Sequence, residues 1–468
     1  MIAVYIYRDF WAKYDCNLKI FYKMSVDRIE QDNLAESKRT SHGAKGTPAP
    51  VSSPKAKSNP KPIIKLVVDP GTSLSKIFYV VDEGTVKWMT MGAEYLTLPT
   101  ASAKSLPIDS GMGQPEDNAW VRLSKTGECH AVGFVASNYR ARVSIKKLKH
   151  ESLPFKILAA VGAIAQREKL GNSFKLKLGI LLPYSEYRLE HDWSSELKTA
   201  LASFYFQDRL FKVKLTSFSC KPEGYGIAKF TSRCESADYF HQGNTAVVML
   251  GYRNTSCLFF RRGTVSKPES GTTDLGFYTL LDKLIDKAPG LSRSDILKAI
   301  VNQVEVSYGR TGNNQTYFNY KEFSSMIDFG SLVKADSVEL RQKKTEKLEK
   351  DYSTSLQEYW ILLENWLSEL LPRATEIDAF VFAGGSSDLL SSRFRNYTIS
   401  LGVKNFDNSA SEELKKYLLH SKDPRKEKFM RENLAKRFAD VWGFFVPFAN
   451  YDLNLILDRN TGEVISHG

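Results

Sequence analysis

The chain carries IIKLVVDPGTSLSK at residues 63–76 and, far along it, AVVMLGYRNTSCLFF at residues 246–260. Each stretch is an apolar run that predicts a buried strand, then a tight turn containing glycine, then a second apolar run. A third stretch, IDAFVFAGGSSDLL at residues 377–390, predicts a strand that ends in two glycines and opens a helix. Together they are compatible with an α/β fold built from two similar halves.

The first turn offers the groups that a phosphate loop needs. The candidate ligand-binding residues there are Asp69, Gly71, Thr72, Ser73 and Lys76. Glycine allows the turn, the hydroxyls and backbone N–H groups donate to phosphate oxygens, Lys76 neutralises charge, and Asp69 can hold a magnesium-bound water. A strand-end Asp-Pro-Gly is also an ordinary turn, and the classical GxxxxGK[ST] loop is absent.

The second turn and the glycine pair offer similar chemistry. The candidates are Gly251, Tyr252, Arg253, Asn254 and Thr255 in the turn, and Gly384, Gly385 and Ser386 after the third strand. Backbone N–H groups, side-chain amide and hydroxyl, and the guanidinium suit phosphate, whereas paired glycines let the backbone approach a base or ribose. Taken alone, the turn at residues 251–255 could be an ordinary hairpin turn, and the glycine pair could be an ordinary loop.

A carboxylate is the candidate catalytic group. LLPYSE at residues 181–186 predicts a strand end followed by Glu186, which could orient or deprotonate an attacking water. Glutamates after strands are common, so this motif indicates a catalytic site only in combination with the other motifs.

In this order, the motifs resemble the ParM/StbA branch of bacterial actin-like proteins over about residues 63–455. LVVDPGTSLSK resembles the first phosphate loop, VVMLGYRNTS the second, LLPYSEY the LPxxEY segment and VFAGGSSDLL the adenosine loop. SLPFKILAAVGAIA, TDLGF and RFADVWGFF also resemble this branch, especially plasmid and cyanobacterial versions. The resemblance implies an actin-like fold of two lobes, each with a five-stranded type of mixed sheet flanked by helices, and ATP with Mg²⁺ in the cleft.

The resemblance further implies ATP-dependent self-assembly into filaments, hydrolysis assisted by Glu186, and Mg²⁺ held through water by Asp69. A DNA-binding adaptor or regulator would be a partner in plasmid or DNA segregation. One residue departs from the pattern, because the family's second loop begins with Asp and Met249 stands there. Losing one preorganised polar group lowers rates roughly 10²–10³-fold, so we expect slow, weak ATPase activity and a stable cytoskeleton as an alternative role.

The resemblance also sets domain boundaries. We expect a disordered basic tail at residues 1–62, one lobe at 63–243, a second at 244–415, and a C-terminal segment at 416–468 that returns to the first lobe. Residues 25–62 are rich in Ser, Pro and Lys, which is typical of a tether. Met24 is an alternative start of translation, in which case residues 1–23 do not belong to the protein. Otherwise the aromatic and basic residues within 1–23 suit binding to a membrane surface.

Composition leaves other classes open. The net charge of +12 is compatible with DNA or anionic membrane binding through the tail, or with ordinary basicity. The five cysteines, at 16, 129, 220, 234 and 257, form no CxxC pair, and no run is long enough to span a membrane, which favours the cytoplasm, including the inner face of the cell membrane. The alternatives are a non-polymerising ATPase or kinase of the same superfamily, and a basic nucleic-acid-binding adaptor.

Three helices are predicted from apolar spacing and end signals. The first covers 152–171, with Pro154 in its first turn and Gly171 at its end. The second runs from Asp336 to Leu371 behind a capping-box-like start, with an apolar stripe that predicts core packing. The third lies near residues 426–445.

Overall fold

The computed structural model describes residues 60–99, 106, 113–141, 148–234, 237–301, 307–310, 316–319, 327–406, 409–421, 423, 425–431 and 434–451. The described residues between 60 and 451 belong to one compact unit. The predicted tail at 1–62 therefore lies outside the described residues except for its last three. No helix in the described part is long and apolar enough to cross a membrane.

Nine of the described strands join into a first sheet, in the order β3-β2-β1-β7-β9-β8-β5-β6-β4. Strand β1 lies antiparallel to β2 and parallel to β7, which is parallel to β9, so the first five strands form the mixed sheet that was expected. The bounds are β1 (Ile63–Pro70), β2 (Leu74–Val81), β3 (Lys87–Gly92), β4 (Tyr95–Leu98), β5 (Trp120–Leu123), β6 (Cys129–Val132), β7 (Ser173–Leu182), β8 (Phe204–Phe206) and β9 (Arg209–Pro222).

The second sheet repeats this plan. Its order is β12-β11-β10-β16-β17, with β13 also paired to β11. Strand β10 lies antiparallel to β11 and parallel to β16, as β1 does to β2 and β7. The bounds are β10 (Asn244–Leu250), β11 (Thr255–Arg261), β12 (Thr264–Val265), β13 (Gly271–Thr273), β16 (Ala379–Ala383) and β17 (Lys404–Phe406). Strands β14 (Ser307–Arg310) and β15 (Thr316–Asn319) form a separate antiparallel pair.

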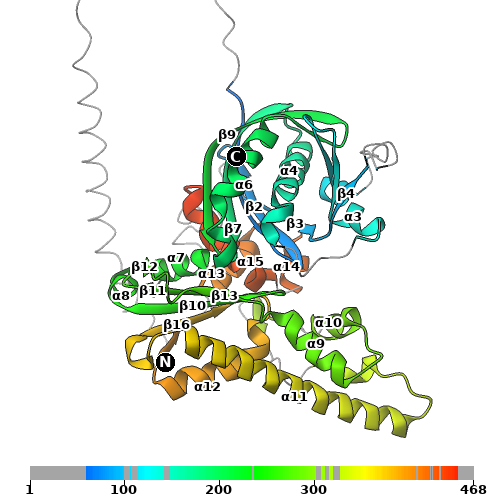
Figure 1. Cartoon of the computed structure of the whole chain (residues 1–468), viewed down its shortest axis with the longest axis vertical. Helices are drawn as coiled ribbons and strands as arrows, with labels where there is room; N and C mark the ends of the chain where they lie inside the picture. The colour runs from blue at the N-terminus through cyan, green and yellow to red at the C-terminus, as the bar shows by residue number, and fades with distance from the viewer. Residues whose placement is uncertain are drawn as a thin grey trace, which may run out of the picture. The chain divides into compact units, whose positions relative to one another are not determined.

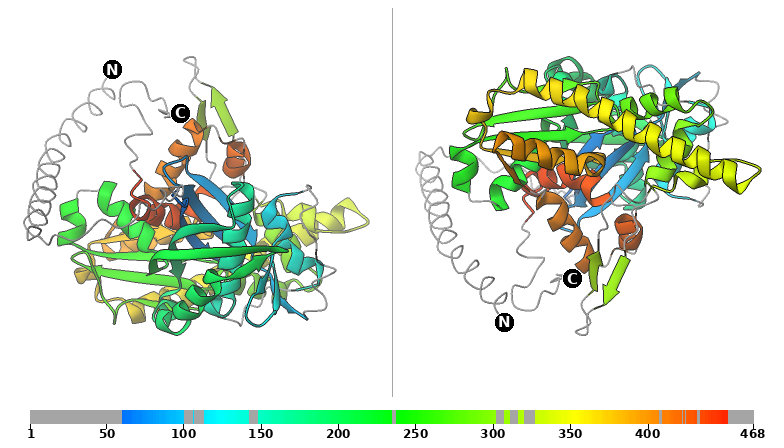
Figure 2. Two further views of the ribbon diagram at one scale, coloured as in Figure 1. Left: turned by 90° about the horizontal axis from the view of Figure 1, so that it is seen from above. Right: turned by 90° about the horizontal axis from the view of Figure 1, so that it is seen from below.

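Helices cover both faces of both sheets (Figures 1 and 2). The major ones are α4 (Lys149–Arg167), α6 (Glu190–Ala202), α7 (Tyr225–Cys234), α9 (Phe277–Lys287), α11 (Val338–Leu370), α12 (Ser391–Leu401), α13 (Ser409–His420) and α15 (Leu434–Phe448). The shorter ones are α3 (Phe134–Asn138), α5 (Tyr184–Tyr187), α8 (Ala237–Gln242), α10 (Arg293–Val301) and α14 (Lys426–Arg431), with 3₁₀ turns η2 (Pro115–Asn118), η4 (Phe329–Leu332), η5 (Ala374–Glu376) and η6 (Ser387–Leu390).

Strand alternation decides which core each side chain joins. In β1, Ile64, Leu66 and Val68 pack with α4 and α6, whereas Val67 points the other way. In β10, Val247 shares a core with Val67, and this core is filled by residues of α7, α13 and α15. Helices α9, α11 and α12 pack on the far side of the second sheet. The helices α7, α13 and α15 thus lie between the two sheets (Figure 1).

Several predicted helix ends were wrong. Helix α4 begins at Lys149 and ends at Arg167, so Pro154 lies inside it and Gly171 lies beyond it. The long helix is capped by Ser337, whose hydroxyl accepts from the Leu340 N–H, rather than by Asp336. Its predicted stripe does pack as core, with Leu348, Tyr359 and Leu363 buried. The last predicted helix is two helices, α14 and α15.

Candidate functional site

The first turn joins β1 to β2 and is closed by backbone bonds. The Gly71 N–H donates to the Asp69 carbonyl oxygen (2.9 Å), and a Cβ on Gly71 would lie 2.5 Å from the Leu74 carbonyl oxygen, so only glycine fits. Asp69 and Lys76 are cross-strand partners and form an ion pair. Asp69 is buried, and its Oδ1 accepts no hydrogen bond within the described structure. Thr72 is also buried, whereas Ser73 is exposed.

The second turn joins β10 to β11 and rests on α9. The N–H groups of Phe277 and Tyr278, in the first turn of α9, donate to the carbonyl oxygens of Gly251 (3.0 Å) and Tyr252 (2.8 Å). The Tyr252 ring packs against both aromatic rings, and the Thr255 hydroxyl donates to the Leu275 carbonyl oxygen (2.6 Å). These two side chains therefore hold the turn.

Two further residues of this turn are buried polar groups. Asn254 is buried, and its Nδ2 donates to nothing in the described part of the chain. Arg253 reaches across to the first sheet and donates from Nη2 to Glu186 Oε1 (2.8 Å). An unused buried donor at Asn254 is the kind of group that an incoming phosphate oxygen satisfies.

Glu186 is held from two directions. It lies in α5 directly after β7 and is 1% exposed. Besides the Arg253 bond, its Oε2 accepts from the backbone N–H of His150 (2.9 Å) and lies 3.2 Å from His150 Nδ1. Because His150 is in the first turn of α4, the carboxylate also benefits from the positive end of that helix. The candidate catalytic group thus bridges the two sheets with both of its oxygens in use.

A lysine and a glutamate that sequence reading missed complete the centre. The Lys149 ammonium pairs with Glu223, at the end of β9, and lies 3.7 Å from Asp69 Oδ1. Glu223 Oε2 in turn accepts from the Ser256 hydroxyl (3.3 Å), on β11. Met249 is the cross-strand partner of Ser256, so it stands beside this link. The chain Lys76–Asp69–Lys149–Glu223–Ser256 therefore connects the two turns.

The glycine pair lies against the second turn and the last helix. Gly384 has φ +100°, and a Cβ there would lie 2.2 Å from the Leu250 carbonyl oxygen. Gly385 packs on Arg437 of α15, which also donates to the Ser73 hydroxyl (3.2 Å). Ser386 precedes the 3₁₀ turn η6, which intervenes before the expected helix. Arg437 thereby joins the glycine pair to the first turn.

Burial and nearby charges shift several pKa values in this cluster. Burial alone would raise the pKa of Asp69, but Lys76 and Lys149 outweigh it and hold that pKa below its usual value. Burial opposes the charge of Lys149, yet Glu223 and Asp69 raise its pKa. Burial, reinforced by Lys149, lowers the pKa of Lys156 on α4 to about 8. Asp69 and Lys149 are therefore both charged at neutral pH.

Asp440 links α15 to the turn that carries Glu223. It is buried and accepts the backbone N–H groups of Gly224 (2.8 Å) and Ile227 (3.1 Å), at the start of α7. Here α7 and α15 touch, because a Cβ on Gly226 would lie 1.9 Å from the Asp440 carbonyl oxygen. Burial raises the pKa of Asp440 to about 7, with Asp69 and Glu223 adding to the rise. Asp440 thus fixes the position of Glu223.

The missed residues had weak local signals. Lys149 falls in the first turn of α4, three residues before the predicted helix start. Glu223 follows β9, whose alternating FKVKLTSFS pattern indicates a strand that could have been recognised. Arg437 and Asp440 lie in RFADVWGFF, a segment that carries the sequence resemblance, but no local pattern shows that the tertiary fold brings α15 to the two turns.

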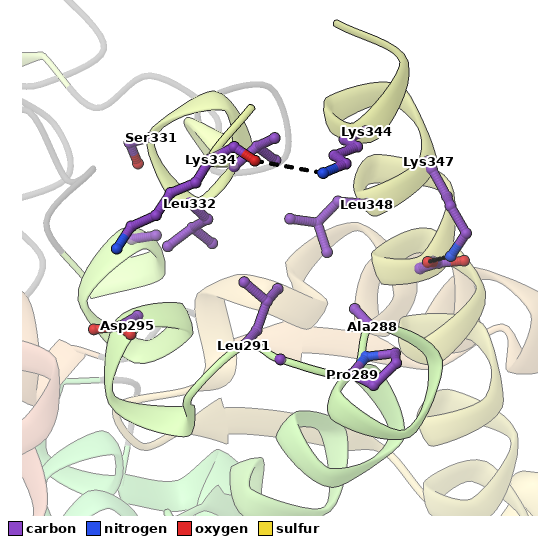
Figure 3. A pocket seen from close by; sticks show the side chains of 14 residues that line it. Ala288, Pro289, Leu291, Asp295, Ser331, Leu332, Lys334, Lys344, Lys347 and Leu348 are labelled. Atoms are coloured by element: carbon purple, nitrogen blue, oxygen red, sulfur yellow. Dashed lines mark hydrogen bonds and ion pairs between the residues drawn. The ribbon is translucent and has the colours of Figure 1, made fainter. Parts of the chain in front are cut away.

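A cavity of about 780 Å³ lies elsewhere, between α9, α10, η4 and α11 (Figure 3). Leu291, Leu332 and Leu348 point into it, and Lys344 donates to the Lys334 carbonyl oxygen (3.4 Å) at its edge. None of the candidate ligand-binding residues lines it.

The chain is similar to known proteins in three-dimensional structure. No known protein-family profile matches the chain, and no curated protein matches it in sequence. An archaeal actin homologue in complex with ADP is similar over 83% of this chain and 99% of that one, at 14% identity and a TM-score of 0.51. A selenomethionine structure of that homologue is similar over 83% of this chain and 100% of that one, at 15% identity and a TM-score of 0.50. A 15-stranded ParM filament from Clostridium botulinum is similar over 83% of this chain and 99% of that one, at 13% identity and a TM-score of 0.49.

The two similarities to the archaeal actin homologue agree with the two sheets and their shared topology. The chain therefore has an actin-like fold, as the sequence motifs predicted.

Proposed function

We propose that this protein binds ATP in the cluster formed by the two turns, the glycine pair and the start of α4. The observation that supports this proposal is that four motifs far apart in sequence meet through direct contacts. Glu186 bonds to Arg253, Gly384 lies against Leu250, and Asp69 is linked to Ser256 through Lys149 and Glu223. The ADP complex of the structurally similar archaeal actin homologue supports a nucleotide as ligand. The candidate residues of the sequence analysis are proposed to contact it.

Each part of the cluster suits one part of the ligand. The backbone of both turns and the unused Asn254 amide would donate to phosphate oxygens, with Lys76 and Lys149 neutralising charge. The glycine pair would leave space for the ribose and base. Arg253 donates to Glu186 from Nη2, and other N–H groups of its guanidinium could donate to phosphate.

Mg²⁺ fits this site through water. Asp69 Oδ1 is a buried acceptor without a hydrogen bond, which suits a water bound to the ion. Within the described residues, no group of three or more His, Cys, Asp or Glu could hold a metal directly. When bound with the nucleotide, the ion would neutralise charge on the phosphates. Asp69 would orient its water shell.

Glu186 is the proposed residue that orients the attacking water. Its oxygens accept from Arg253 and His150, and a carboxylate has further lone-pair sites that could accept from a water. Glu223 is the competing carboxylate, because Lys149 links it directly to Asp69. Met249 presents a thioether beside Glu223 and Ser256, where a carboxylate would complete a polar centre. We therefore propose slow hydrolysis.

We further propose that ATP binding drives self-assembly into filaments, in a stable cytoskeleton or in plasmid or DNA segregation with a DNA-binding adaptor. This rests on the sequence resemblance to ParM/StbA-type proteins together with the actin-like fold. The lobes at 63–243 and 244–415, the returning segment at 416–468, and a cytoplasmic setting are part of the same proposal. The basic tail is proposed to contact anionic membrane or DNA.

Calorimetric titration of ATP with Mg²⁺ tests the binding proposal. We expect saturable binding to the full chain, weakened by Asn254→Leu, which removes an unused donor while keeping the volume. The matched control is Asn172→Leu, an amide in the loop between α4 and β7 that accepts from Arg209 and lies outside the cluster. Absence of ATP binding by the unmodified chain would refute the proposal.

A further inference from the structure

One face of the first sheet carries lysines at matching positions on three neighbouring strands. In β1, β7 and β9, these lysines alternate with the apolar residues that pack with α4 and α6, so they point to the opposite face. Strand pairing places Lys65 beside Lys177, and Lys175 beside Lys214. Lys212 lies two residues before Lys214 on β9 and therefore shares its face. We call these five residues the lysine face.

The core between the two sheets reaches only part of this face. It includes Val67 of β1 and Leu181 of β7, and none of its described members lies on β9. Lys212 and Lys214 are exposed, whereas the lysines on β1 and β7 are half-buried. The β9 side of the lysine face is thus accessible to a partner.

Most of this positive charge is not compensated within the protein. Lys65 pairs with Glu83 (3.1 Å). Among the described residues, the side chains of the other four lysines form no ion pair and no hydrogen bond. Like charges at adjacent positions of neighbouring strands repel each other, so the contact of Lys175 with Lys214 lowers the stability of the protein alone. An anion bound to the face would offset that cost.

The arrangement of the lysines favours an extended anion over a small one. Their Cα atoms lie about 6.6 Å apart along a strand and about 4.8 Å apart between strands. The ammonium groups therefore form an array on a sheet, and the cavity beside α11 is lined by other residues. A small anion would meet one or two of these charges, whereas a chain of phosphates would meet all of them.

The face also lacks the apolar groups that would favour a membrane. In the described part of the chain, none of the exposed large apolar side chains lies on β1, β7 or β9. Binding to a membrane surface gains strength from apolar side chains buried among the lipids. Binding to a nucleic-acid backbone relies on lysine and arginine alone. The composition of the face therefore favours nucleic acid.

We propose that the lysine face binds the phosphate backbone of nucleic acid directly and without sequence preference. Each ammonium group donates to phosphate oxygens and releases a condensed counterion. The face carries charge and no group placed to read base edges, so it does not distinguish sequences. This surface is separate from the nucleotide cluster and from the basic tail, and its use requires neither ATP nor an adaptor.

Fluorescence anisotropy of a labelled DNA duplex, measured over a range of salt concentrations with the full chain, tests this inference. The lysine-face variant changes Lys175, Lys177, Lys212 and Lys214 to Gln. The matched control changes four exposed lysines that form no ion pair within the described structure, namely Lys198, Lys267, Lys343 and Lys350, to Gln. Both variants keep the tail and have the same net charge, so a difference between them reports on the face.

The salt dependence gives the expected magnitude. Each phosphate contact contributes about 0.9 to the slope of log affinity against log salt concentration. We expect the lysine-face variant to reduce this slope by about 2–4 and to weaken binding at least about tenfold at low salt. The control should change the affinity less than about threefold, because its lysines attract DNA only over a distance. A second duplex of unrelated sequence should give the same values.

Thermal unfolding gives a second readout. Without DNA, the lysine-face variant should melt at or above the unmodified chain, because it removes repulsion between neighbouring lysines. If the fourfold variant does not fold, the double variant Lys212→Gln with Lys214→Gln changes only exposed side chains, and it should reduce the slope by about 1–2.

Three results would overturn the inference. The first is equal DNA affinity and slope in the lysine-face and control variants, and the second is no DNA binding by the unmodified chain. The third is binding to phosphatidylserine vesicles that depends on the lysine face while DNA binding does not, which would assign the face to a membrane. Titration with ATP tests the proposed function separately, and its outcome does not bear on this face.

Discussion

Breaking the ion pair between Glu186 and Arg253 should destabilise the protein strongly. The pair joins the first sheet to the second, with side chains 1% and 5% exposed. Arg253→Met leaves a buried carboxylate that keeps only the His150 donors. Glu186→Gln leaves an amide oxygen that can still accept from Arg253. We therefore expect Arg253→Met to cost more than Glu186→Gln.

The burial of both partners sets the magnitude. Removing one partner of a buried pair costs about 3–5 kcal/mol, because the other charge is left without compensation. We expect about this much for Arg253→Met. The double variant should recover part of the loss, giving a coupling energy above about 1.5 kcal/mol in a double-mutant cycle.

Urea unfolding of the ligand-free protein, followed by tryptophan fluorescence, measures these free energies. The control cycle uses Arg293→Met and Asp282→Asn, an exposed pair whose side chains are 46% and 39% accessible. Its coupling should stay below about 1 kcal/mol. Additive losses at Glu186 and Arg253, with no coupling, would show that the pair does not form and would refute the reasoning.

Three further predictions concern single positions. Met249→Asp should speed phosphate release about 10²–10³-fold, with Met249→Leu as control; an unchanged rate would remove this explanation of slow hydrolysis. Gly384→Ala should destabilise more than Gly402→Ala by at least about 2 kcal/mol, because both have positive φ but only the first would place Cβ against the Leu250 carbonyl oxygen; equal melting temperatures would contradict this. Because burial raises the pKa of Asp440 from 3.8 to about 7, its stabilising contribution is complete below about pH 4 and lost as the pH rises through about 7. Asp440→Asn should flatten the melting temperature between pH 5 and 8, and an unchanged slope would exclude this residue.

The sheets and turns could be predicted because their signals are local. Apolar runs, the Asp-Pro-Gly turn and the glycine pair each occupy a few consecutive residues, and the hairpins β1–β2 and β10–β11 form where expected. Element ends were less predictable. Helix α4 starts early because Leu148 and Glu151 provide its first-turn bonds, a signal weaker than Pro154.

The chemistry of the cluster was only partly predictable. Arg253 and Glu186 were identified as separate groups, and no sequence pattern shows that they bond to each other across the two sheets. Lys149, Glu223 and Arg437 enter through helix faces and strand ends that meet only in three dimensions. Pairing between distant charges depends on the tertiary fold, so a single sequence does not encode it locally.

Sedimentation with negative-stain electron microscopy tests whether this protein assembles in an ATP-dependent way. The full chain is spun with and without ATP and Mg²⁺ while phosphate release is followed in parallel. We expect filaments that pellet with ATP, together with slow phosphate release. Rapid turnover of filaments would contradict the role assigned to Met249. No filaments with any nucleotide would contradict ATP-dependent assembly and leave a nucleotide-binding enzyme that does not polymerise.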